Sequence, residues 1–205
     1  MHTHKIGILG FGKLGVRIAQ RCIRTGMNPQ DILVVDRLST REQINTLGVR
    51  AVSPRELAHV DILLVAVKPY QRLEALVSVG ELGNVTVISF MANVSLAQLR
   101  EQLPTARLVR AMTTTACEVG HGVGLYTTTP DFDENGHRLV RDLLERLGRH
   151  DFVHDERHVQ VYATVLSSLT GMVYQLLGDF ERGLNHIGAP RAYRELMLEA
   201  VAASV

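Results

Sequence analysis

The chain has 205 residues, of which 22 are basic and 21 acidic, and 46% are hydrophobic. This size and hydrophobic content allow one well-packed domain of roughly 100–200 residues with a smaller appendage. The charge is balanced and no basic stripe alternates with aromatic residues, so we expect no nucleic-acid partner. The two cysteines, Cys22 and Cys117, form no disulfide framework, and the nine histidines form no known metal-ligand spacing, so we expect no metal.

The N-terminus lacks the charged and apolar regions of a signal peptide. The longest apolar stretch, residues 159–177, is interrupted by polar side chains such as Gln160, Thr164 and Gln175. Such a stretch is too polar for a bilayer span and is typical of a buried helix or a subunit interface. We therefore expect a cytoplasmic protein without a membrane partner.

Strand and helix patterns alternate through the first three quarters of the chain. An apolar run at residues 6–9 ends at Gly10, a helical pattern covers residues 13–24, and a second apolar run at residues 32–35 stops at Asp36. We expect further strands at residues 61–67 (in mid-sheet), 85–90, 108–112, 123–126 and around 152–153, and helices that begin at Thr40, Ser53 and Ser95 or cover residues 131–147.

After Asp155 the pattern is helical to the end, with one break at residues 188–190. Alternating strands and helices followed by helices alone predict an α/β fold: a doubly wound Rossmann-type sheet with a small C-terminal all-helical domain. We place the sheet domain at residues 1–152 and the helical domain at residues 153–205.

Residues 10–15 match the pattern G-x-G-x-x-G between the first strand and the first helix, which is the context that a dinucleotide-binding loop requires. Glycine allows the tight turn, the close approach of a pyrophosphate and the packing of helix on strand. The free amide groups at the helix start then bind the anion. The predicted cofactor-binding residues here are Gly10, Phe11, Gly12, Lys13, Leu14 and Gly15.

The residues after the second strand leave the choice of cofactor open. Asp36 can accept hydrogen bonds from a ribose 2′-hydroxyl, which favours NAD. Arg37 and Arg41 can pair with a 2′-phosphate, which favours NADP, or they can be solvated loop residues. We expect NAD or NADP as the cofactor.

Several segments together resemble the pyrroline-5-carboxylate reductase family. Residues 61–69 (DILLVAVKP) are similar to that family's A-D-V-V-x-L-A-V-K-P, and residues 88–96 (ISFMANVSL) are similar to its I-S-x-x-A-G-V-S-L. Residues 109–112 (VRAM) and 188–191 (GAPR) resemble its V-R-x-M and G-L-P-R segments. The pieces follow the family's order over about residues 6–205.

This resemblance implies an enzyme that transfers hydride from NAD(P)H to the C=N bond of a small cyclic imino acid, as in proline biosynthesis. It adds Ala66, Val67, Lys68, Pro69 and Ala92 to the cofactor-binding residues. It also implies that the C-terminal helices form a dimerisation domain, so that the protein is a homodimer or a larger homo-oligomer.

The departures from the family lie where the substrate would bind. The family's P-N-T-P is residues 113–116 (TTTA) here, and its S-G-S-G-P-A-Y corresponds to residues 166–172 (LSSLTGM). Ser168 and Thr170 are the predicted catalytic residues because their hydroxyls can contact a substrate carboxylate, although hydroxyls on an apolar helix also bond back to their own backbone. His121 is either a proton donor or a turn residue.

The helical domain is also shorter than that of the family, so we expect it to be incomplete. Two alternatives to the reductase therefore stay open. One is a non-catalytic dinucleotide-binding or regulatory protein that has lost the substrate pocket. The other is a reductase of the same fold that acts on a different imine or carbonyl compound.

Overall fold

The computed structural model describes residues 4–36 and 41–202. Its centre is a sheet of eight strands in the order β3-β2-β1-β4-β5-β6-β7-β8. All neighbouring strands run parallel except β6 and β7, which are antiparallel. The strands are β1 (Ile6–Leu9), β2 (Ile32–Val35), β3 (Arg50–Ala51), β4 (Ile62–Val65), β5 (Thr86–Ser89), β6 (Arg107–Ala111), β7 (Gly122–Thr128) and β8 (Gly148–Phe152).

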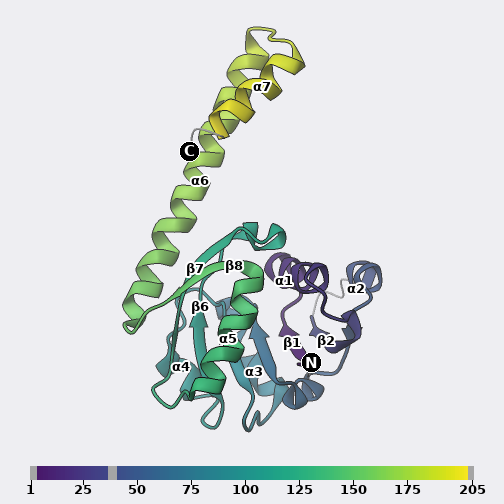
Figure 1. The fold of residues 1–205 in the computed structure, drawn as a ribbon, viewed down its shortest axis with the longest axis vertical. Coiled ribbons are helices and arrows are strands. Elements are labelled where there is room, and N and C mark those ends of the chain that lie inside the picture. Colours follow the sequence, from purple (N-terminus) through teal and green to yellow (C-terminus); the bar gives the residue numbers. More distant parts are fainter. Residues whose placement is uncertain (1–3, 37–40, 203–205) are drawn as a thin grey trace. The chain divides into compact units, whose positions relative to one another are not determined.

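Helices lie on both faces of this sheet, as a doubly wound fold requires (Figure 1). The α-helices are α1 (Lys13–Arg24), α2 (Arg41–Leu47), α3 (Arg72–Val79), α4 (Leu96–Arg100), α5 (Glu134–Leu147), α6 (Glu156–His186) and α7 (Arg191–Ala202). Four short 3₁₀ helices complete the described elements: η1 (Pro29–Asp31), η2 (Pro54–His59), η3 (Pro69–Gln71) and η4 (Thr115–Val119).

Each face of the sheet has its own hydrophobic core, because successive side chains of a strand point to opposite faces. Ile8 and Leu64 pack with α1 and α5 on one face. Leu9 and Leu63 pack with α3, α4 and η2 on the other. The adjacent strands β1 and β4 therefore carry no polar side chain, and β4 is fully buried in its central position, as the sequence predicts.

The register of the parallel strands brings their carboxyl ends to one edge. Leu9, the last residue of β1, pairs with Val35 of β2 on one side and with Val65 of β4 on the other. The chain turns in one direction from β1 to β2 and β3, and in the opposite direction from β4 to β5 and β6. The place where the order reverses, between β1 and β4, is where open α/β sheets bind ligands.

Two compact units make up the chain, residues Met1–Ala163 and Thr164–Val205. The first two turns of α6 belong to the first unit, in which Val159 and Ala163 are buried. The boundary that the sequence suggests, after residue 152, stays a prediction.

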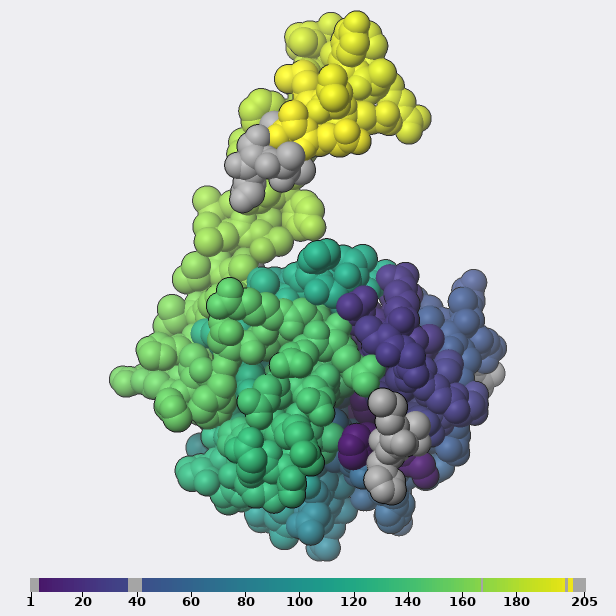
Figure 2. Space-filling view, viewed as in Figure 1, coloured from purple at the N-terminus to yellow at the C-terminus, as the bar shows by residue number. Residues whose placement is uncertain are grey.

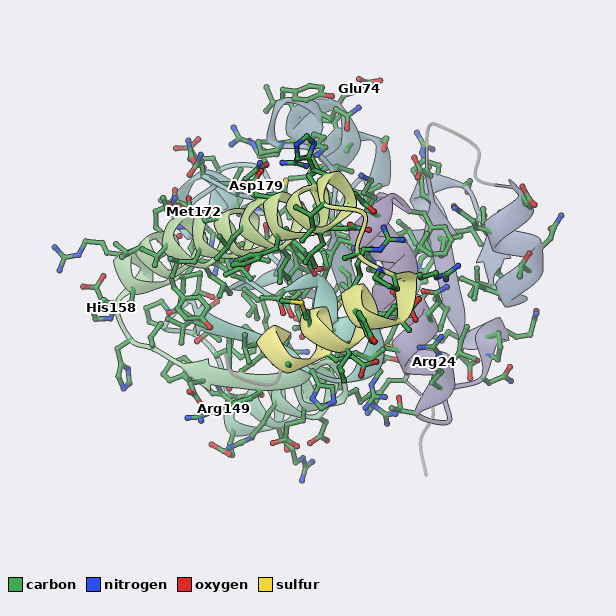
Figure 3. All side chains as sticks on the ribbon, turned by 90° about the horizontal axis from the view of Figure 1, so that it is seen from above. Arg24, Glu74, Arg149, His158, Met172 and Asp179 are labelled. Atoms are coloured by element: carbon green, nitrogen blue, oxygen red, sulfur yellow. The ribbon has the colours of Figure 1, made fainter. Side chains whose placement is uncertain are left out.

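The second unit consists of the rest of α6 and α7, with a break at Gly188, whose φ is +69°. Many of its large apolar side chains are exposed, among them Leu169 and Met172 on α6 and Leu196 on α7. The two helices are light green to yellow in Figure 2, and Met172 is labelled in Figure 3. By length and composition alone, α6 is long and apolar enough to cross a membrane, as core helices of soluble proteins can also be. The expectation that residues 159–177 do not span a membrane stays a prediction.

The predicted Rossmann-type sheet with C-terminal helices is confirmed. Ser53 and Glu56 stand at the expected capping positions, where the Glu56 carboxylate accepts from the amide and the hydroxyl of Ser53, both at 2.8 Å, but the helix that they open is the short 3₁₀ helix η2. Thr40, which was expected to cap α2, lies outside the described residues.

Candidate functional site: a dinucleotide loop at the carboxyl edge

The loop after β1 is held in place by the neighbouring strands. The Gly10 amide donates to the Val35 carbonyl at 2.8 Å, and the Ala66 amide donates to the Leu9 carbonyl at 2.9 Å. The φ of Gly10 is +98°, and a Cβ there would lie 2.8 Å from backbone atoms of Ala66 and Val67. Only glycine fits this turn, both because of its conformation and because of its packing.

The amino end of α1 is open toward the space beyond this loop. Gly12 is the N-cap residue, and among the described residues no side chain accepts a hydrogen bond from the amides of the first turn. That turn contains no acidic residue, and a Cβ on Gly12 would meet no protein atom within 4 Å. Free amides, a positive helix end and open space beside Gly12 fit the pyrophosphate of a dinucleotide.

Some of the other loop residues face the space proposed for the cofactor, and others pack into the core. Phe11 is fully buried in the core beside α1 and α5, so its side chain packs inside the protein and only its backbone faces the loop. A Cβ on Gly15 would collide with the Gly10 carbonyl oxygen, so this glycine lets α1 pack against β1. Lys13 is exposed and Leu14 is half-buried. The expectation that all six residues bind the cofactor stays a prediction, with Phe11 limited to backbone contacts.

Asp36 follows β2 directly and is half-buried. It lies one residue beyond Val35, whose carbonyl holds the glycine loop, so it stands at the same edge of the sheet. Arg37 and the side chain of Arg41 lie outside the described part of the structure.

The residues expected from the family resemblance come to this same edge. Ala66 and Val67 are half-buried where β4 ends, and Lys68 and Pro69 are exposed at the start of η3. Ala92 is exposed beyond β5, the next strand of the sheet. The structure thus gathers the predicted dinucleotide residues of β1, β4 and β5 along three adjacent strand ends.

Known proteins share both the sequence pattern and the fold. A family model described as NADP oxidoreductase, coenzyme F420-dependent, matches residues 5–93. The pyrroline-5-carboxylate reductase of Aquifex aeolicus is 29% identical over 71% of this chain, a match that covers 56% of that enzyme's own length. The enzyme of Corynebacterium melassecola is 28% identical over 91% of this chain and 73% of its own. By sequence, this chain is similar to the pyrroline-5-carboxylate reductases.

A solved pyrroline-5-carboxylate reductase has the same fold. The structure of the Plasmodium falciparum pyrroline carboxylate reductase, which has NADP bound, aligns with a TM-score of 0.89 over 100% of this chain and 78% of its own, at 20% sequence identity. The predicted family resemblance is confirmed, and NAD or NADP is the cofactor class of that family.

The predicted catalytic hydroxyls lie apart from the glycine loop in the chain, on α6 within the second unit. The Thr170 hydroxyl donates to the Leu166 carbonyl at 2.8 Å, which is the backbone hydrogen bond that hydroxyls on helices often form. Ser168 is exposed. Unlike a glycine-rich turn, this segment continues as regular helix, so the assignment of Ser168 and Thr170 to catalysis stays a prediction.

The two cysteines, Cys22 and Cys117, are free thiols buried in the core. Burial raises the pKa of Cys22 to about 12 and that of Cys117 to about 11. Thiols with such values carry almost no thiolate at neutral pH and are poor nucleophiles. His121, the alternative proton donor, is exposed at the end of the η4 turn.

An open pocket of about 810 Å³ lies at the opposite edge of the sheet. Its lining includes Asp61, Val85 and Arg107, which stand at the amino ends of β4, β5 and β6. Of the predicted site residues that the structure describes, none contributes to it. Ligands of open α/β sheets bind at the carboxyl edge, so we assign the site to the glycine loop and not to this pocket.

One buried polar cluster was missed by the sequence reading. Arg110 in β6 is 5% exposed in its side chain and forms an ion pair with Glu156 at 2.8 Å. A charged residue inside the apolar run of residues 108–112 was the only sequence signal for it, because its partner lies 46 positions further along the chain.

His150 in β8 predicts a dependence of stability on pH. Burial holds the pKa of His150 below its ordinary value of 6.5. The unfolded chain therefore takes up the proton first as the pH falls, so this contribution to stability is complete above about pH 6.5 and is lost as the pH drops below it. We expect the free energy of unfolding in urea to fall between pH 7.5 and 5.5, and to fall less in His150→Leu.

The exposed His158 serves as the control for that measurement. The variant His158→Leu should keep the pH dependence of the wild-type protein. If the free energy of unfolding depended on pH equally in His150→Leu and in the wild-type protein, a group other than His150 would be responsible for that dependence.

Proposed function

We propose that this chain is an NAD(P)H-dependent reductase that transfers hydride to the C=N bond of a small cyclic imino acid. The observation that carries the proposal is the preformed glycine loop at the carboxyl edge, together with the relatives that carry this activity in their names. The bound nicotinamide would supply the hydride, and the protein would supply binding and orientation.

The residues of the chain have separate tasks in this proposal. The amides of Lys13, Leu14 and Gly15 hold the pyrophosphate at the start of α1, and Asp36 accepts hydrogen bonds from the ribose of the adenosine half. The backbone of residues 66–69 and Ala92 lie along the nicotinamide half. Ser168 and Thr170 on α6 contact the carboxylate of the substrate.

Purified protein is the material for the test. Binding of NADH and NADPH is measured by calorimetry, and oxidation of each is followed with pyrroline-5-carboxylate and with a panel of other cyclic imines and carbonyl compounds. Turnover with pyrroline-5-carboxylate supports the proposal. Turnover only with another imine or carbonyl compound replaces the substrate and keeps the reductase.

A second function is favoured by a specific feature, the uninterrupted helix at residues 166–172 with its back-bonded Thr170. Such a segment offers fewer free amides to a carboxylate than a glycine-rich turn. The chain would then be a dinucleotide-binding or regulatory protein. Tight binding of a reduced cofactor without turnover of any compound in the panel would establish this second function and exclude the first.

We further propose that the protein is a cytoplasmic homodimer or a larger homo-oligomer. The support comes from the apolar side chains that α6 and α7 expose, such as Met172, which is 67% exposed. Exposed apolar faces of this kind mark interaction sites. Sedimentation that gives the mass of a single chain at micromolar concentration would contradict this proposal.

The cofactor preference can be changed at Asp36. A carboxylate at the end of β2 repels a 2′-phosphate, so Asp36→Ala should improve binding of NADPH relative to NADH by about 10-fold, on the scale of a single charged contact. Dissociation constants for both cofactors measure this change. Asp36→Asn keeps a hydrogen-bonding side chain and is the matched control for the charge. A shift toward NADH would contradict the ribose assignment.

A further inference from the structure

Arg110 is the centre of a polar network that joins two distant segments of the first unit. Its Nη1 donates to Glu156 Oε1 at 2.8 Å, and its Nη2 donates to Gln160 Oε1. Both acceptors lie one turn apart on α6, so a single guanidinium contacts one face of the first turns of that helix. Arg110 itself is held in β6 in the interior of the protein.

The two acceptors reach on to the loop between β5 and α4. Glu156 Oε1 also accepts from the Leu96 amide at 2.8 Å, and Gln160 Nε2 donates to Asn93 Oδ1 at 2.6 Å. Both ends of residues 93–96 are therefore connected to Arg110 by hydrogen bonds, the first end through Gln160 and the last through Glu156.

The backbone of Asn93 has an unusual conformation that a hydrogen bond to its side chain can help to hold. Its φ is +58°, and among the described residues it is the only one other than glycine with a positive φ. Asparagine tolerates this conformation better than most residues but is strained in it relative to glycine. The family segment that residues 88–96 resemble has glycine at this position, whereas this chain has an asparagine whose side chain accepts a hydrogen bond from Gln160.

The loop matters because Ala92, next to Asn93, stands at the nicotinamide end of the proposed cofactor site. Positioning errors of about 1 Å at a reacting centre lower rates by as much as ~100-fold. We propose that Arg110 is a positioning residue, which acts through Gln160 and Asn93 to fix the backbone at Ala92 against the nicotinamide. It touches neither substrate nor cofactor, and the inference rests on the proposed reductase function.

A double-mutant cycle on the exposed end of the network tests the inference. Asn93→Gly keeps the turn and removes the amide, and Gln160→Met keeps the length of the side chain and removes its polar atoms. Each single variant should lower kcat by about 10-fold, with a change in the cofactor dissociation constant smaller than 2-fold, by the positioning argument. Because the two side chains act through one hydrogen bond, the double variant should be no worse than either single variant.

A second readout does not depend on turnover. Hydrogen exchange of the amides in residues 91–96 should be faster in Gln160→Met than in the wild-type protein, because the far end of the network is released. The matched control is Gln43→Met, which replaces an exposed glutamine on α2 and should change neither readout. Arg110→Lys, which keeps the charge but not the two-pronged geometry, should recover more kcat than Arg110→Met.

The inference would be overturned if the losses of kcat in the two single variants multiplied in the double variant. It would also be overturned if hydrogen exchange at residues 91–96 were unchanged in Gln160→Met. Should Arg110→Met fail to fold, the cycle of Asn93 and Gln160 decides alone. Should the wild-type protein turn over no substrate, the proposed function fails, and the exchange experiment still decides whether the network sets the loop.

Discussion

Replacement of Gly12 by alanine is expected to weaken dinucleotide binding by at least about 10-fold, or about 1.4 kcal/mol, without lowering the thermal stability of the protein. A methyl group there meets no protein atom within 4 Å, and the φ of Gly12, −82°, is open to any residue. The methyl group would occupy the space that a pyrophosphate needs beside the first turn of α1. Calorimetry with NADH and NADPH and a thermal unfolding curve measure the two effects.

Gly10→Ala is the matched comparison, because we expect it to lower the thermal stability of the protein, which Gly12→Ala should not do. Its methyl group would lie 2.8 Å from backbone atoms of Ala66 and Val67 at a φ of +98°. Strain of this kind costs about 1–3 kcal/mol of stability, so this variant should unfold at a lower temperature. Unchanged cofactor affinity in Gly12→Ala would mean that the glycine loop is not the pyrophosphate site.

The second large effect concerns the ion pair between the buried Arg110 and Glu156, whose side chain is 28% exposed. Glu156→Leu leaves a guanidinium with 5% exposure without its counter-charge. Because Glu156 is partly exposed and Arg110 keeps its hydrogen bond to Gln160, we expect a loss of about 1.5–3 kcal/mol, the scale of a hydrogen bond to a charged group, in the free energy of unfolding measured in urea. The Leu96 amide loses its acceptor in the same variant.

Glu156→Gln separates charge from hydrogen bonding in that measurement. The amide oxygen can still accept from Arg110 and from Leu96, so this variant should lose less stability than Glu156→Leu. Equal losses would show that only the negative charge matters. No loss in either variant would show that the pair does not stabilise the first unit.

The sequence predicted the part of the fold that depends on local pattern. Residues 6–15 form a strand, a glycine turn and a helix because apolar periodicity and glycine spacing act over a few residues. The two-residue strand β3 was missed because both of its residues are exposed and it is too short to show a period. Helix α3 was missed because its apolar residues include the exposed Leu73 and Val77, which blur its amphipathic pattern.

The features that the sequence could not supply are those made by distant residues. The antiparallel direction of β7 depends on how the chain returns to β6, and no residue in β7 encodes it alone. The network of Arg110, Glu156, Gln160 and Asn93 joins positions up to 67 apart. Its members are individually unremarkable polar residues, and only the folded chain brings them together.

Two backbone hydrogen bonds affect how fast a nucleotide can bind. The Gly10 amide donates to the end of β2, and the Ala66 amide donates to the end of β1. A loop already fixed by three strands has little conformational freedom left to lose when a ligand arrives. Encounter with the nucleotide should then be governed by diffusion and charge, with no slow rearrangement of the loop in the association kinetics.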